Sequence, residues 1–266
     1  MRRPPALVAG AVMVGIVVAV ALLGPLVVPH DPFLQDLSGG LQPPSATHWF
    51  GTDQLGRDIF SRVVVATRTD LRIAVLAATA PFVVGVGVGL VSGYAGGYLD
   101  WLVSRVVDTV IAFPFYVLVI AIVFAAGTGE RGILIAYAIV GWIPYARVIR
   151  ARTRALTRQG WVDAARGGGL SHPRVLVVHL LPNVIGQAVV LLMTEILLIM
   201  VAVVTLGYLG LGVQPPTPDW GTMISDGQPF LATMWWIPTL PGLAVVFTGI
   251  GLSLLGDGLA DRWRLR

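Results

Sequence analysis

Six apolar runs, each long enough to cross a lipid bilayer as a helix, constrain this sequence more than any other feature. They cover about residues 7–28, 73–91, 106–126, 132–148, 184–212 and 235–255. A spanning helix needs about 20 apolar residues, because a helix rises 1.5 Å per residue. Within lipid the backbone groups can bond only to one another, so each run is predicted to be helical. The predicted fold class is therefore all-α: a polytopic membrane protein with six transmembrane helices.

The composition excludes several other classes of protein. Charged residues make up 12% of the 266 residues, about half the roughly 25% of a soluble domain. The chain has no cysteine, which excludes disulfides and thiolate metal sites. It also has no lysine and so cannot form an ATP-binding P-loop. The net charge is +4, but the sequence has no stripe of basic residues interleaved with aromatic ones. We therefore expect no nucleic-acid partner.

The placement of arginines predicts the orientation in the membrane. Six crossings put both termini on one side, and thirteen arginines lie on that side: Arg2, Arg3, Arg105, Arg147, Arg150, Arg152, Arg154, Arg158, Arg166, Arg174, Arg262, Arg264 and Arg266. The other side has five: Arg57, Arg62, Arg68, Arg72 and Arg131. Because cytoplasmic loops carry the excess of basic residues, both termini are predicted to be cytoplasmic in a plasma (inner) membrane protein.

Three parts of the chain follow from these spans. Residues 1–47 hold the first helix and the start of an outer loop, and residues 48–72 form an outer segment. Residues 73–266 form a five-helix core, which includes a cytoplasmic loop at 149–183. The first apolar run is longer than the 7–15-residue core of a signal peptide, so we expect it to remain as a helix.

The cytoplasmic loop predicts a short helix, a turn and a second helix. Asp163 suits the positive first turn of a helix, and Ala164 and Ala165 offer a small surface that another protein can approach closely. The glycines at 167–169 end that helix, and the Ser-His-Pro sequence at 171–173 starts the next one. A basic hairpin that touches anionic lipid headgroups is the alternative interpretation.

This loop also resembles a known motif. The block Asp163-Ala-Ala-x-x-x-Gly169, with His179-x-Leu-Pro182 after it, resembles the cytoplasmic EAA loop of type I (MetI-like) ABC-importer permeases. Four further blocks, at 50–58, 93–100, 206–221 and 255–261, resemble the C-type subunit of dipeptide and oligopeptide (peptide/nickel) importers. Asp163 and His179 depart from the family's usual Glu and Ile.

The resemblance implies a function and a set of partners. It implies a transmembrane permease subunit of an ATP-driven importer, which moves dipeptides or short peptides by alternating access. A sister permease, two ATPase subunits, an extracytoplasmic binding protein and membrane lipid are the implied partners. ATP and Mg would lie on the ATPases, so no cofactor, metal or catalytic residue is expected in this chain. The implied ATPase-coupling residues are Asp163, Ala164, Ala165, Gly169, Leu170 and Pro182.

Other functions stay open at this point. Nickel chelates or haem are alternative substrates for a permease of the same family. An intramembrane protease is the alternative class, but the sequence contains neither an HExxH nor a GxSxG motif.

Three residues are candidates for the translocation path. Glu195 is the only acid deep within an apolar run, and such a group faces protein or water rather than lipid. It can recognise a substrate amino group or act at a gate, or it can be a protonated acid bonded to a neighbouring helix. Pro114 and Pro144 predict helix kinks, which suit a gated path but also occur in static bundles.

A glycine every four residues, at Gly85, Gly89, Gly93 and Gly97, predicts a flat stripe for close helix packing. Lining of a pore is the alternative role.

The outer segments hold candidate contacts for a binding protein: Asp53, Arg57, Asp58, Asp219 and Trp220. The spacing of Asp53 and Arg57 predicts a local ion pair. A purely structural loop is the alternative, and Trp220 also suits an aromatic belt at the membrane surface.

Overall fold

The computed structural model describes residues 5–264, and within that range every regular element is a helix. Arg2, Arg3 and Arg266, which entered the orientation argument, lie outside the described residues. The six-pass prediction is confirmed, with the third pass built from a bent pair of helices. The passes are α1 (Pro5–Val27), α2 (Ile59–Ala95), α3 (Gly97–Ile111) with α4 (Phe115–Ala126), α5 (Glu130–Val140) with α6 (Trp142–Thr157), α9 (Leu181–Tyr208) and α11 (Trp236–Arg264).

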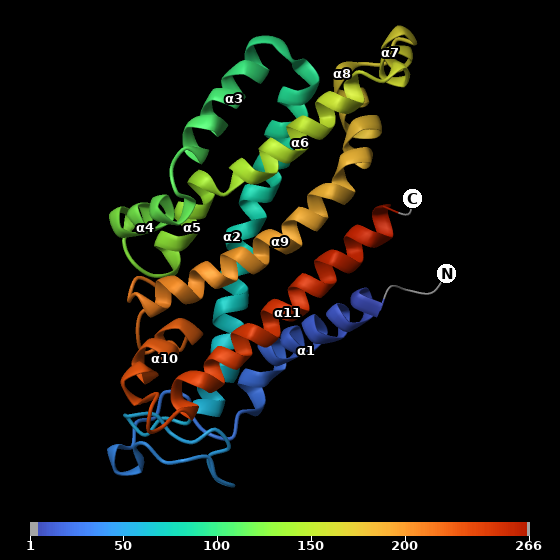
Figure 1. Ribbon diagram of the computed structural model, residues 1–266. Coiled ribbons are helices and arrows are strands. Elements are labelled where there is room, and N and C mark those ends of the chain that lie inside the picture. Colours follow the sequence, from blue (N-terminus) through green and yellow to red (C-terminus); the bar gives the residue numbers. More distant parts are fainter. Residues whose placement is uncertain (1–4, 265–266) are drawn as a thin grey trace.

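Short elements lie at the two ends of this bundle. At the end predicted to be extracytoplasmic, called the outer side below, are η1 (Leu37–Gly39), α10 (Trp220–Gly227) and η3 (Gln228–Phe230). At the end predicted to be cytoplasmic, called the inner side below, are α7 (Gly160–Gly167), α8 (His172–Arg174) and the π-helical η2 (Val175–Leu180), which continues into α9. Figure 1 shows that α7 and α8 lie toward the same end as both termini, with α10 at the opposite end. This arrangement matches the predicted sidedness of the loops.

The second crossing begins earlier than the sequence predicts. α2 starts at Ile59 rather than near residue 73, so residues 59–72 of the predicted outer segment are helical. Its 37 residues extend over about 55 Å, which is longer than the hydrocarbon layer is thick. Asp58 caps its first turn, because its carboxylate accepts a hydrogen bond from the Ser61 amide at 2.8 Å.

Both predicted proline kinks coincide with interruptions of helices. The chain bends by 86° between α3 and α4, and Pro114 lies directly before the first residue of α4. The other interruption is at Gly141, between α5 and α6. Pro144 follows it in the first turn of α6 and cannot donate the backbone hydrogen bond to Val140.

The glycine stripe packs α2 against α6, as predicted, at three of its four positions. A methyl group on Gly85, Gly89 or Gly93 would lie 2.5–2.8 Å from a carbonyl oxygen of α6. The two backbones therefore touch with no room for a side chain between them. Gly97 has a different role: it begins α3 with a φ of +57°, and a methyl group on it would meet no atom within 4 Å.

This packing predicts opposite effects for two alanine substitutions in α2. Gly89→Ala places a methyl group 2.8 Å from the Ala146 carbonyl, so we expect a loss of about 1–3 kcal/mol of stability. Gly87 has open space around it, so Gly87→Ala is the matched control and gains helix propensity of up to about 1 kcal/mol. The thermal unfolding midpoints of the two purified variants in detergent measure the difference, and equal midpoints would contradict the packing.

Candidate functional site

A cavity of about 700 Å³ lies where the two helix interruptions meet α9. It brings together all three candidate path residues, Glu195, Pro114 and Pro144, which lie up to 81 positions apart in the chain. Apolar side chains form most of its wall. The remaining lining residues are Val110, Ile111, Phe113, Phe115, Tyr116, Tyr137, Ile143, Arg147, Val148, Leu198 and Ile199.

The interruptions of the helices explain why this space is open. The 86° bend between α3 and α4 puts the end of one helix and the start of the next on the same wall. On another wall, α6 starts after Gly141 and contributes Ile143, Pro144 and Arg147. Small-molecule sites have volumes of roughly 300–1,000 Å³. The cavity is therefore of the right size for a small ligand and too small for a folded protein.

Glu195 is the acid of this cavity. Its side chain is largely buried in α9, and Ile199, one turn further on, lines the same wall. None of the described residues gives its carboxylate an ion pair or a hydrogen bond. Tyr116, Tyr137 and Arg147 are the other polar side chains that line the space, each from a different helix, and the sequence analysis named none of them as a path residue. The arrangement leaves one carboxyl group on the cavity wall without a side-chain partner among the described residues.

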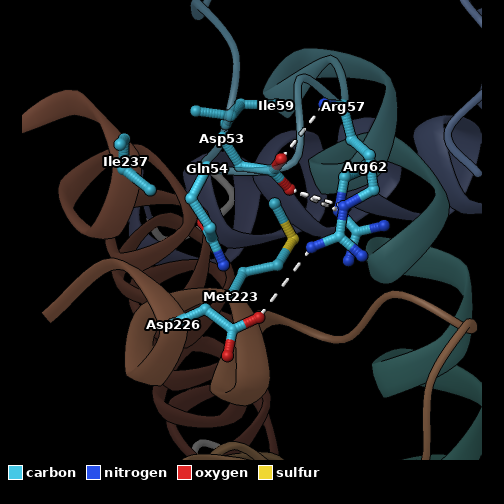
Figure 2. Close-up of a pocket in the computed structure, with 8 residues that line it drawn as sticks. All are labelled: Asp53, Gln54, Arg57, Ile59, Arg62, Met223, Asp226 and Ile237. Atoms are coloured by element: carbon cyan, nitrogen blue, oxygen red, sulfur yellow. Dashed lines mark hydrogen bonds and ion pairs between the residues drawn. The ribbon is translucent and has the colours of Figure 1, made fainter. Parts of the chain in front are cut away.

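A buried ion-pair cluster holds the outer end of α2 (Figure 2). The predicted pair is confirmed: Arg57 Nε lies 2.7 Å from Asp53 Oδ2, and both side chains are buried. Arg62 Nε lies 3.7 Å from the same carboxylate oxygen. Arg57 also extends toward α10, where its Nη2 lies 3.9 Å from Asp226 Oδ2. Burial raises the pKa of the Asp226 carboxyl, while the neighbouring Arg57 and Arg62 guanidinium groups act in the opposite direction.

The outer block at residues 50–58 folds as a tight turn whose residues bond to one another. Asp53 Oδ1 accepts hydrogen bonds from the amides of Leu55 and Arg57, at 2.9 and 3.0 Å. Gly51 and Gly56 have φ values of +75° and +73°, a conformation that other residues rarely adopt. The side chains of Asp53, Arg57 and Asp58 point inward, so this structure offers none of them as a surface contact for a binding protein.

Trp220 is buried, so its predicted place in an aromatic belt is wrong. Its amide donates to Asp70 Oδ2 at 3.0 Å, and its indole Nε1 donates to the Val63 carbonyl at 3.2 Å. Asp219, the buried N-cap of α10, accepts a hydrogen bond from the Thr222 amide, and burial raises its pKa. The sequence analysis missed the role of Asp70, although it shares helical spacing with the buried apolar residues of α2.

The inner hairpin has the predicted helix–turn–helix form. α7 ends at Gly167, Gly169 has a φ of +85°, and Ser171 precedes α8. Val162 anchors the hairpin in a buried cluster with Val175 and Leu180. The predicted coupling residues divide into two groups. Asp163, Ala164, Gly169 and Pro182 are exposed, while Ala165 and Leu170 are half-buried against the same cluster.

A second set of contacts ties the hairpin to the end of α2. The hydroxyl of Tyr94 lies 2.6 Å from Nδ1 of His172, and the Arg166 guanidinium stands 6.0 Å from the Tyr94 ring centroid. These side chains connect the inner end of α2 with both arms of the hairpin.

Comparison with known proteins identifies the class to which this fold and cavity belong. Residues 85–264 match the family described as binding-protein-dependent transport system inner membrane component. Residues 1–44 match the N-terminal transmembrane domain of oligopeptide transport permease C. The chain belongs to the family of binding-protein-dependent transport system inner membrane components.

Several curated relatives are similar over nearly the whole chain. A dipeptide transport system permease protein of Alkalihalophilus pseudofirmus is 34% identical over 98% of this chain and 86% of its own length. An oligopeptide transport system permease protein of Bacillus subtilis is 37% identical over 95% of this chain and 83% of its own length. A glutathione transport system permease protein of Pectobacterium atrosepticum is 33% identical over 96% of this chain and 85% of its own length. These matches confirm the resemblance and the prediction of a transport permease subunit rather than an enzyme.

The ion-pair cluster predicts unequal effects for two arginine substitutions. Arg57→Gln removes the ion pair at 2.7 Å from Asp53 and leaves only Arg62, at 3.7 Å, so we expect a loss of about 3–5 kcal/mol. Arg72, whose exposed side chain pairs with Glu130 at 2.5 Å, gives the matched control Arg72→Gln, with an expected change within about 1 kcal/mol. Thermal unfolding of the purified variants compares them, and a larger loss in the Arg72 variant would refute the ranking.

Proposed function

We propose that this chain is the transmembrane permease subunit of an ATP-driven importer that moves dipeptides and short peptides across the plasma membrane by alternating access. The cavity carries the proposal, because it combines a volume of about 700 Å³ with one carboxylate that has no partner. The names of the relatives, which specify dipeptide, oligopeptide and glutathione transport, support a peptide as the substrate.

Glu195 is proposed to bind the α-amino group of the peptide. A carboxylate within a largely apolar wall attracts a cation more strongly than it would in water, since the local dielectric constant is lower. The apolar wall then accommodates side chains of different sizes without selecting among them. Selection is left to the extracytoplasmic binding protein.

We expect Glu195→Gln to lower the apparent affinity for transported dipeptides about tenfold or more, the equivalent of one charged hydrogen bond. Thr194→Val is the matched control, because Thr194 is the exposed neighbour in the same helix. Uptake of labelled dipeptide into vesicles that contain the assembled importer measures the effect. Equal uptake by Glu195→Gln and the wild type would leave Glu195 with a structural role only.

The exposed face of the hairpin is proposed to seat in the ATPase subunit. Asp163, Ala164, Gly169 and Pro182 offer small or polar groups to a partner, while Ala165 and Leu170 hold the hairpin against the bundle. To shift a 1:99 population to 99:1, a partner must bind one state about 5.5 kcal/mol more tightly than the other. A hairpin anchored by Val162 and tied to Tyr94 is rigid enough to pass such a difference to α2 and α6.

The coupling proposal predicts that Ala164→Trp abolishes ATP-dependent uptake and stimulated ATPase activity while the chain still inserts into the membrane. Gly169→Asp is expected to act in the same direction, since its backbone has a φ of +85°. Ala151→Trp, an equally exposed alanine on α6, is the matched control. Normal uptake by Ala164→Trp would favour the alternative, in which the hairpin touches only lipid headgroups.

The remaining partners and the orientation complete the proposal. A sister permease forms the other half of the pore, two ATPase subunits with ATP and Mg bind on the inner side, and a binding protein docks on the outer side. The side that carries the hairpin, with its excess of arginine, is assigned to the cytoplasm together with both termini. Asp53, Arg57, Asp58, Asp219 and Trp220 are proposed to serve the binding protein indirectly, by holding the outer turn and α10 in shape.

A further inference from the structure

Two histidines and a carboxylate meet on the outer side of the protein, away from the cavity and the hairpin. His30 follows α1, His48 lies within the outer segment, and Asp58 is the N-cap of α2. One possible ligand atom from each of the three residues lies within 4.8 Å of the other two. The group includes two of the four histidines of the chain, and it joins three segments that are separate in sequence.

Within this group His48 Nδ1 and Asp58 Oδ1 form a hydrogen bond, and His30 Nδ1 stays outside it. Asp58 Oδ1 lies 2.9 Å from His48 Nδ1 and 3.7 Å from His30 Nδ1. Ligand atoms about 2.0–2.1 Å from a tetrahedral zinc ion lie about 3.3 Å apart, so the two distances bracket the required value. His30 Nδ1 is buried and has no hydrogen-bond partner among the described residues.

The helix cap leaves one carboxylate oxygen for a metal. Asp58 Oδ2 accepts hydrogen bonds from the amide and the hydroxyl of Ser61, at 2.8 and 2.7 Å. Oδ1 faces the two imidazoles, whose rings stack with their centroids 4.5 Å apart. The carboxylate is fixed and almost fully buried, whereas the side chains of His48 and His30 are 23% and 38% exposed.

We propose that His30, His48 and Asp58 form a binding site for a divalent transition-metal ion, with zinc as the best fit. Two imidazole nitrogens and one carboxylate oxygen are ligands that zinc accepts, and water completes the tetrahedron. The ion fastens the end of the first crossing and the outer segment to the first turn of α2. It stabilises the outer face and takes no part in the cavity.

Zinc binding to the full-length chain in lipid nanodiscs tests this inference. The chain carries a purification tag without histidine, is stripped with a chelator, and is titrated with zinc against a chromophoric competitor. We expect one zinc ion per chain and a thermal unfolding midpoint that rises with zinc concentration. His30→Ala and His48→Ala are each expected to weaken binding by about tenfold or more, since even loss of a residue that only supports a ligand costs 10–100-fold.

His172→Ala and His179→Ala are the matched controls, because both histidines lie at the opposite end of the bundle. We expect these two substitutions to leave zinc binding unchanged. Midpoints measured without zinc verify that each variant is folded. The inference is overturned if the wild type binds no zinc in stoichiometric amount. It is also overturned if the double variant His30→Ala/His48→Ala binds as well as the wild type, or if the control variants lose zinc equally.

Discussion

The direct contact between the backbones of α2 and α6 is the interaction on which the rest of the structure depends. Gly85, Gly89 and Gly93 leave no room for a side chain between the two helices. Contacts of this kind resist sliding, because any shift brings a carbonyl against a Cα. We therefore expect α2 and α6 to move as one rigid unit. Its inner end meets the hairpin through Tyr94, and α6 supplies one wall of the cavity.

Ion pairs stabilise the outer end of α2 in addition to its apolar packing. Charges removed from water are stable only when they are paired or hydrogen-bonded, and Asp53, Arg57 and Arg62 supply that pairing for one another. Asp70 lies further along α2 and accepts a hydrogen bond from the backbone amide of Trp220, which is 150 positions away in the chain. These contacts hold α10 and the outer turn on the same helix that reaches the hairpin, so α2 connects the two ends of the bundle.

The sequence predicted the elements that depend on local pattern. Apolar runs marked the crossings, Pro114 marked the bend, and the glycine spacing marked a packed face. Sequence analysis failed where the partner is distant in the chain. Arg62 and Asp70 fall within the outer segment at 48–72 that the apolar runs left outside the predicted helices, and their burial depends on groups contributed by the outer turn and α10. The site at His30, His48 and Asp58 was missed for the same reason, since its spacing matches no local metal motif.

Electron spin resonance distances in the assembled importer test the central claim, that the cavity changes shape around a rigid unit of α2 and α6. The chain has no cysteine, so spin labels can be attached to introduced cysteines alone. One pair, at Phe113 and Leu198, spans the cavity, and a second, at Val91 and Arg152, lies on exposed positions of α2 and α6. We predict that ATP changes the first distance and leaves the second unchanged. A cavity distance that stays constant in every nucleotide state, or a change between α2 and α6 alone, would contradict the claim.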